Sequence, residues 1–84
     1  MKITFSQLKK LSVQTQSGVY LGKVVDVVLS VEENLILQYK VRSYKIVGHT
    51  FLINNSQVRE ITAEKIVVDD ASLPDATAVF STSV

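Results

Sequence analysis

Few side chains in this sequence are suited to catalysis. The chain has one histidine, His49, and no cysteine, so cysteine nucleophiles and thiolate zinc ligands are excluded. The Gly-x-Ser-x-Gly pattern that presents a nucleophilic serine is absent from the sequence. His49 follows a glycine at the start of a predicted strand, where we expect a surface histidine rather than a general base. We therefore predict no catalytic residue and no enzymatic activity.

The paired carboxylates are better suited to turns than to metal binding. Glu32–Glu33 and Asp69–Asp70 are adjacent pairs at the ends of predicted strands. Neighbouring side chains point apart on a strand, so neither pair can converge on one ion. Gly18 and Gly22 lead into a strand instead of a helix, which excludes a phosphate-binding loop. No metal and no other cofactor is predicted.

Asp26 is the one carboxylate within an apolar run, SGVYLGKVVDVVL at residues 17–29. It stands in mid-strand without a second acid or a histidine nearby in sequence. We predict a structural role, in which the carboxylate accepts backbone N–H groups or pairs with a base and so fixes the bend or register of the strand. Gly18 is predicted to take a positive φ, and Gly22 to permit a bulge or a close backbone approach.

Short strands are predicted to position these residues. Thr4 and Gln7 fit a capping box, which predicts a helical turn over residues 4–10. Turn residues separate apolar runs rich in β-branched side chains, so the chain is predicted to be all-β. The turn 32–34 should join the first two long strands into a hairpin. The strands are expected at residues 19–31, 35–44, 49–53, 58–61 and 65–68.

The alternation of the hairpin strands predicts which side chains face the core. On the second strand, one face is predicted to be apolar and the other carries Gln38, Lys40 and Arg42. Both faces of the first strand are partly apolar, which indicates a strand covered on both sides, by the N-terminal turn, the C-terminal tail or another subunit. The apolar faces are predicted to be Val25, Val27, Leu29 and Val31 on the first strand, and Leu35, Leu37, Tyr39 and Val41 on the second.

The size and composition indicate a single small globular domain. The chain has 84 residues, of which 46% are hydrophobic, and a chain this short without disulfides needs a well-filled core or oligomerisation. The N-terminal residues form no secretory signal, and no apolar stretch is long enough to span a membrane. A cytoplasmic location is therefore expected.

The charges are unevenly distributed although the net charge is only +1. Residues 1–45 hold seven Lys or Arg against three Asp or Glu, and residues 46–84 hold two against five. Lys40, Arg42, Tyr44 and Lys45 share the outward face of one predicted strand. They could contact RNA or an acidic partner. The alternative is a solvated strand face that discourages aggregation.

The last residues, 71–84, differ from the rest of the chain. They contain its one proline, Pro74, and many small or hydroxylated residues, with Val79 and Phe80 at the only apolar point. A free tail is one interpretation. In the other, the tail adds a strand to a sheet edge of this subunit or another, so that Val79 and Phe80 contact a dimer partner. The domain itself is predicted over residues 1–70.

The order of these elements resembles the PRC-barrel domain. The family's opening element looks like FSQLKKLSV at residues 5–13, and its glycine turn followed by Lys-Val and Asp-Val looks like SGVYLGKVVDVV at residues 17–28. The closing part is similar to FLINNSQVREITAEKIVVDD at residues 51–70. Asn54 and Asn55 stand where many members have a proline and often a tryptophan, so contacts of those residues are not carried over.

The resemblance implies a small antiparallel six-stranded β-barrel, with a short N-terminal helical turn, that docks onto other proteins. Members form the cytoplasmic part of a photosynthetic reaction-centre subunit, half of a ribosome maturation factor, and adaptors linked to archaeal cell division. We expect a non-enzymatic adaptor in a prokaryotic cytoplasm, acting as a homodimer that docks onto a larger assembly. The alternative is an RNA-associated factor similar to those of ribosome maturation. The identity of the protein partner does not follow from the resemblance.

Overall fold

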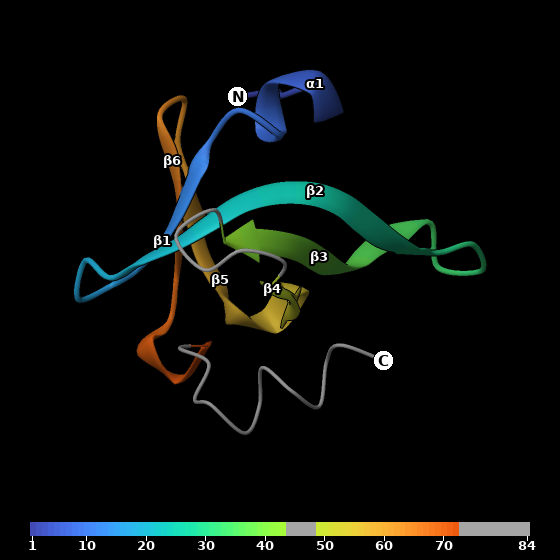
Figure 1. Ribbon diagram of the computed structural model, residues 1–84. Helices are drawn as coiled ribbons and strands as arrows, with labels where there is room; N and C mark the ends of the chain where they lie inside the picture. Colours follow the sequence, from blue (N-terminus) through green and yellow to red (C-terminus); the bar gives the residue numbers. More distant parts are fainter. Residues whose placement is uncertain (44–48, 73–84) are drawn as a thin grey trace.

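A computed structural model describes residues 1–43 and 49–72 of the chain (Figure 1). Six strands form one sheet in the order β4-β3-β2-β1-β6-β5, and a single turn of α-helix precedes them. This confirms the predicted all-β class, the six strands and the N-terminal helical turn. The elements are α1 (Phe5–Leu8), β1 (Ser12–Thr15), β2 (Tyr20–Ser30), β3 (Leu35–Ser43), β4 (His49–Asn54), the 3-10 turn η1 (Asn55–Gln57), β5 (Val58–Ile61), β6 (Lys65–Val68) and η2 (Asp70–Ser72).

The sheet departs from the predicted antiparallel barrel in two respects. First, β1 and β6 run parallel, whereas the other four strand pairs are antiparallel. Second, β4 and β5 are edge strands within the described residues, so the sheet is not closed by hydrogen bonds into a barrel. Strand direction between β1 and β6 depends on the path of about fifty intervening residues, which local sequence patterns do not encode.

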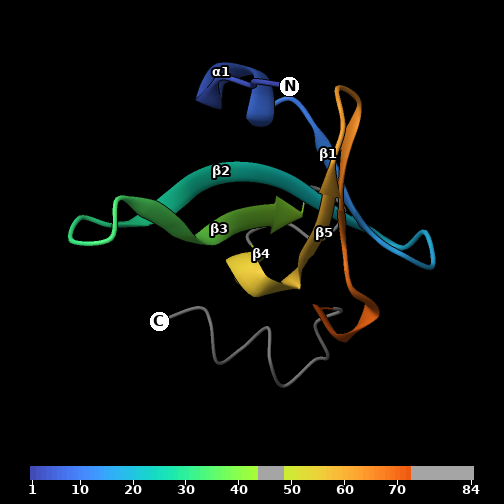
Figure 2. The same ribbon diagram turned by 180° about the vertical axis from the view of Figure 1, so that it is seen from behind.

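The curved sheet wraps around one apolar core, as the views from opposite sides show (Figures 1 and 2). Cross-strand pairs of apolar side chains form much of this core: Val13 lies opposite Ile66 on β1 and β6, and Val24 lies opposite Val41 on β2 and β3. Phe51 and Ile53 of β4 are also buried in this core. The core residues with less than 2% exposure are Ile53, Ile66, Val13, Val24, Val41, Val68 and the polar Thr15.

The N-terminal turn is shorter than the predicted span 4–10, because it ends after one turn. The capping box is present: the Gln7 backbone N–H donates to the Thr4 hydroxyl at 3.2 Å, and the Thr4 N–H donates to the Gln7 side chain at 2.9 Å. Leu8 is buried against the core and Ile3 packs beside it. Propensity for extended structure from residue 12 onward then ends the helix.

The predicted faces of β2 are wrong, because the pairing with β3 is interrupted twice. Val24 pairs with Val41 but Asp26 pairs with Lys40, which leaves Val25 as an extra residue on β2. A second shift lies between residues 28 and 29 of β2. Each bulge reverses the alternation that follows it. The face predicted from odd-numbered residues therefore breaks up: Val25 and Val27 are half-buried, whereas Leu29 and Val31 are exposed.

The same irregularity limits the predicted inner face of β3. Tyr39 and Val41 are buried, as predicted, but Leu35 and Leu37 are exposed. These two leucines lie near the end of the β2–β3 hairpin, which projects beyond the other strands in both views (Figures 1 and 2). Asn34, with φ +58°, completes its turn. The hairpin extends beyond the core, so Leu35 and Leu37 are left exposed by the described residues, whereas Ile36 between them still packs against the core.

Candidate interaction surfaces

Gly22 lies at a close approach between two strands. Its φ is +142°, and a Cβ atom at this position would overlap the backbone carbonyl oxygen of Arg42 on β3. Gly18, in the β1–β2 turn, also has a positive φ, +94°, but open space surrounds it. Both positions therefore demand the conformational freedom of glycine, and Gly22 also demands the absence of a side chain.

Asp26 stands directly after the first bulge of β2 and is exposed to solvent. Its carboxylate Oδ1 accepts the backbone N–H of Val27 at 2.8 Å. Lys40 is its cross-strand neighbour on β3. The contacts combine a backbone hydrogen bond with a nearby base, in an exposed position where each contributes modestly. That Asp26 fixes the register of the strand stays a prediction.

The structure places two of the predicted contact residues on one surface. Lys40 and Arg42 are exposed, two residues apart on the outward face of β3. Tyr44 and Lys45 lie outside the described residues. The same is true of Val79 and Phe80, which were predicted to contact a dimer partner.

A row of basic residues crosses the outward face of four neighbouring strands. Arg42 of β3 lies opposite Lys23 of β2, Lys23 lies opposite Ser12 of β1, and Ser12 pairs with Lys65 of β6. Strands lie about 4.8 Å apart, so the backbone of this row spans roughly 14 Å. Within the described residues none of its three basic side chains pairs with a carboxylate. We call Lys23, Arg42 and Lys65 the cationic row.

Sequence reasoning missed Lys23 and Lys65 as partners of Arg42. They lie 19 and 23 residues from it along the chain, and only the strand pairing brings the three onto one face. The run Lys40-x-Arg42 was visible because both residues share one strand. Lys23 and Lys65 could have been found only by predicting the correct register of β1, β2 and β6.

A groove of about 260 Å³ adjoins the cationic row on β2, β3 and β4. Lys40 of β3 and Leu52 of β4 are cross-strand neighbours in its lining, and Leu52 is 43% exposed. Thr50, also in the lining, is the cross-strand neighbour of Arg42, so the groove and the row are continuous. The groove is lined by Asp26, Val27, Val28, Lys40, Thr50, Phe51 and Leu52.

The end of the β2–β3 hairpin carries a second apolar surface. Its large aliphatic side chains come from both strands and from the turn between them, and Val31 is 86% exposed. Ser30 and Leu35 are paired across the ladder, so these side chains belong to one compact segment. We call the following residues the hairpin patch: Val28, Leu29, Val31, Leu35 and Leu37.

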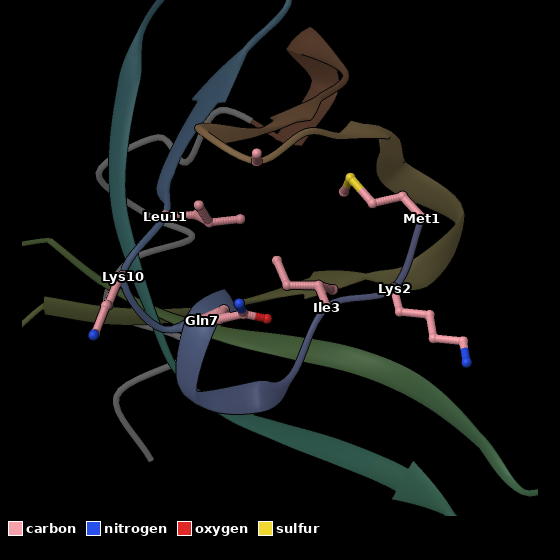
Figure 3. A pocket seen from close by; sticks show the side chains of 7 residues that line it. Met1, Lys2, Ile3, Gln7, Lys10 and Leu11 are labelled. Atoms are coloured by element: carbon pink, nitrogen blue, oxygen red, sulfur yellow. The ribbon is translucent and has the colours of Figure 1, made fainter.

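A cavity of about 240 Å³ lies between the N-terminal segment and the β5–β6 turn (Figure 3). The side chains of Met1, Ile3 and Leu11 point into it, whereas those of Lys2 and Lys10 point away. Its lining within residues 1–43 and 49–72 includes no carboxylate and no imidazole. The cavity therefore offers apolar contact but no group for acid–base chemistry.

The titratable groups give little support for a reaction centre. His49 begins β4 opposite Ser43 and is half-buried. Burial raises the pKa of the Tyr39 phenol above its ordinary value of 10.0, which keeps this core side chain neutral. Residues 1–43 and 49–72 contain no group of three or more His, Asp or Glu that could hold a metal ion.

Comparison with protein families gives one match. A family model for the PRC-barrel domain matches residues 1–72. This chain belongs to the PRC-barrel family. The match confirms the resemblance seen in the glycine turn and the Asp-Val segment. A search of curated proteins finds no match.

Family membership supports a small interaction or scaffold-type module, since PRC-barrel domains mediate protein interactions and are generally non-catalytic. In the part of the chain that the structure describes, no helix is both long and apolar enough to cross a bilayer. The surfaces above are therefore of interest as contact sites for other molecules.

Proposed function

We propose that this PRC-barrel chain is a non-enzymatic adaptor that acts as a homodimer and docks onto a larger assembly in the cytoplasm. The observation that carries the proposal is the hairpin patch, in which five large aliphatic side chains are 39% to 86% exposed on one projecting segment. Exposed aliphatic side chains gathered on one segment commonly mark a protein interface. Burying it would remove apolar area from water, which favours association.

A second copy of the chain is the proposed occupant of the hairpin patch. A two-fold dimer buries the same surface on both subunits, so an aliphatic patch can cover itself without a specific polar partner. The five residues of the patch are all aliphatic, which suits this arrangement, and the exposed Glu32 and Glu33 of the turn lie beside them. Val79 and Phe80 remain candidates for an additional contact in the dimer.

The absence of catalysis in this proposal rests on the family and on the residues available. His49 is the only histidine in the chain. It begins strand β4 and lines neither the groove on β2, β3 and β4 nor the cavity beside the N-terminal segment. The carboxylate in the groove, Asp26, is exposed and already accepts a backbone hydrogen bond.

The homodimer is tested by light scattering coupled to size-exclusion chromatography at micromolar concentration. The wild-type chain should show the dimer mass, and Val31→Lys should shift it toward the monomer by placing a charge in the interface. Val19→Lys is the matched control, because Val19 is exposed in the β1–β2 turn, away from the hairpin patch. A wild-type monomer, or a dimer unaffected by Val31→Lys, contradicts the proposed interface.

The alternative function, an RNA-associated factor of the ribosome-maturation kind, is favoured by the cationic row and Lys40. Such binding would weaken steeply with salt, because phosphate contacts release counterions. Single-stranded RNA usually also needs exposed aromatic side chains for base stacking. Among the described residues that line the adjoining groove, the aromatic side chain is Phe51, which is only 6% exposed. A protein partner therefore fits this surface better, and a filter-binding assay at low salt tests the alternative.

A further inference from the structure

The geometry points to a second docking site, on the outward face of β2, β3 and β4 and sharing only Val28 with the hairpin patch, which binds an acidic peptide segment that carries an aliphatic anchor. The aliphatic side chain enters the groove beside Leu52, and neighbouring carboxylates contact Lys40, Arg42 and Lys23. The occupant is thus a segment of another protein. This inference rests on the proposed function as an interaction module and names the chemistry of its partner.

The cationic row holds two like charges side by side. Lys23 and Arg42 are direct cross-strand neighbours, and like charges in this position repel each other. No carboxylate of residues 1–43 or 49–72 pairs with either of them. An incoming carboxylate would relieve this repulsion and could accept a bidentate hydrogen bond from the guanidinium. The row is therefore complementary to an acidic ligand.

The groove adjoins the cationic row on β3 and β4. Val28 and Leu52 are about 40% exposed and supply apolar walls, and Lys40 lies opposite Leu52 on the neighbouring strand. An apolar side chain placed between them would have the Lys40 ammonium within reach of an adjacent carboxylate. Arg42, two residues after Lys40 on β3, lies opposite Thr50 of the groove lining. Apolar and cationic contacts are thus side by side.

A second copy of the chain and RNA both fit this face less well than an acidic peptide. A second copy that covered this face by a two-fold contact would bring two cationic rows together, which costs free energy. RNA would satisfy the row, but among the described lining residues it would meet only the buried ring of Phe51, which offers no exposed face for base stacking. An acidic peptide with an aliphatic side chain satisfies both parts. Asp26 lies opposite Lys40, and not opposite Lys23 or Arg42, so it leaves the row without a paired carboxylate.

The test is selection of random peptides displayed on phage against the full-length wild-type chain. Enriched peptides should carry Asp or Glu next to Leu, Ile or Val. A fluorescently labelled peptide from this selection should bind about tenfold more weakly to the double variant Lys23→Gln, Arg42→Gln, since two charge-assisted contacts are lost. Leu52→Ser should also weaken binding, and added salt should weaken it for the wild type.

The matched control is the double variant Lys9→Gln, Arg59→Gln, which removes the same charge from exposed residues outside the row and the groove. It should keep wild-type affinity, and thermal melting checks that each variant is folded. Enrichment of peptides without acidic residues, or equal affinity for both double variants, overturns the inference. So does displacement of the peptide by a low concentration of random-sequence RNA.

Failure here is distinguishable from failure of the proposed homodimer. A wild-type monomer that selects acidic peptides would refute the dimer and support this site. A wild-type dimer that selects no acidic peptide would refute this site and leave the dimer standing. The variants also separate the two, because Val31 lies outside the groove, and Lys23 and Arg42 lie outside the hairpin patch.

Discussion

Lys23 and Arg42 lie directly opposite each other on β2 and β3, with no carboxylate of the described residues paired to either. Two cations in this position repel, and the sheet retains them at a cost to folding stability. Such a cost is common where a surface serves binding rather than stability. Removing one of these two charges should stabilise the fold but weaken binding, so it distinguishes a binding role from a structural one.

Arg42→Gln should therefore leave the free energy of unfolding unchanged or raise it by about 0.2–1 kcal/mol, the usual scale of a cross-strand pair. Lys40→Gln is the control, since Lys40 faces Asp26 across the ladder and loses a favourable neighbour. It should be neutral or slightly destabilising. Urea denaturation of the two variants at low salt measures the difference. A clear loss of stability in Arg42→Gln would show that the guanidinium supports the fold.

Gly22→Ala should destabilise the chain more than Gly18→Ala. Both glycines have positive φ, which costs other residues roughly 1–2 kcal/mol. At Gly22 the added Cβ would also collide with the Arg42 carbonyl, so β2 and β3 would have to separate. We expect a loss of about 1–2 kcal/mol for Gly18→Ala and a larger one for Gly22→Ala, measured by urea denaturation. Equal losses would mean that the two strands adjust freely.

The positions of the strands could be predicted from the sequence because local signals mark them. β5 and β6 begin and end as expected, and the capping box of Thr4 and Gln7 fixed the start of α1. These features depend on turn residues, β-branched side chains and contacts within four residues. The order of the opening segment, the glycine turn with its Asp-Val segment and the closing segment also indicated the family, which the match over residues 1–72 confirms.

The candidate sites were less predictable because they depend on register. The extra residue Val25 changes which side chains of β2 face outward, and no local sequence pattern indicated this bulge. The neighbourhood of Lys23, Arg42 and Lys65 requires the parallel pairing of β1 with β6 as well as two antiparallel registers. Exposure of Leu29 and Leu37 followed from the projection of the hairpin beyond the core.

Asp26→Ala should cost only about 0.5–1 kcal/mol, the typical worth of one exposed hydrogen bond. The cost is small because the carboxylate is exposed and its lost partner, the Val27 N–H, can bind water instead. Asp26→Asn keeps an oxygen acceptor and should be closer to wild type. Equilibrium unfolding of both variants measures the effect. If Asp26→Ala were as stable as wild type, the predicted structural role of Asp26 would be lost.

The buried phenol of Tyr39 should make folding sensitive to alkaline pH. Burial raises the pKa of Tyr39 above 10.0 in the folded chain, so the folded state holds this proton where the unfolded state has released it. The unfolded state then binds fewer protons, and stability falls as the pH rises from about 10 through the folded-state pKa. The contribution is fully present below pH 10. Tyr39→Phe removes the phenol and should lose stability less steeply over this range, as measured by urea denaturation at a series of pH values. Lysine deprotonation affects both proteins, so the difference between their slopes isolates Tyr39. Identical slopes would show that the phenol is as accessible to water in the folded chain as in the unfolded one.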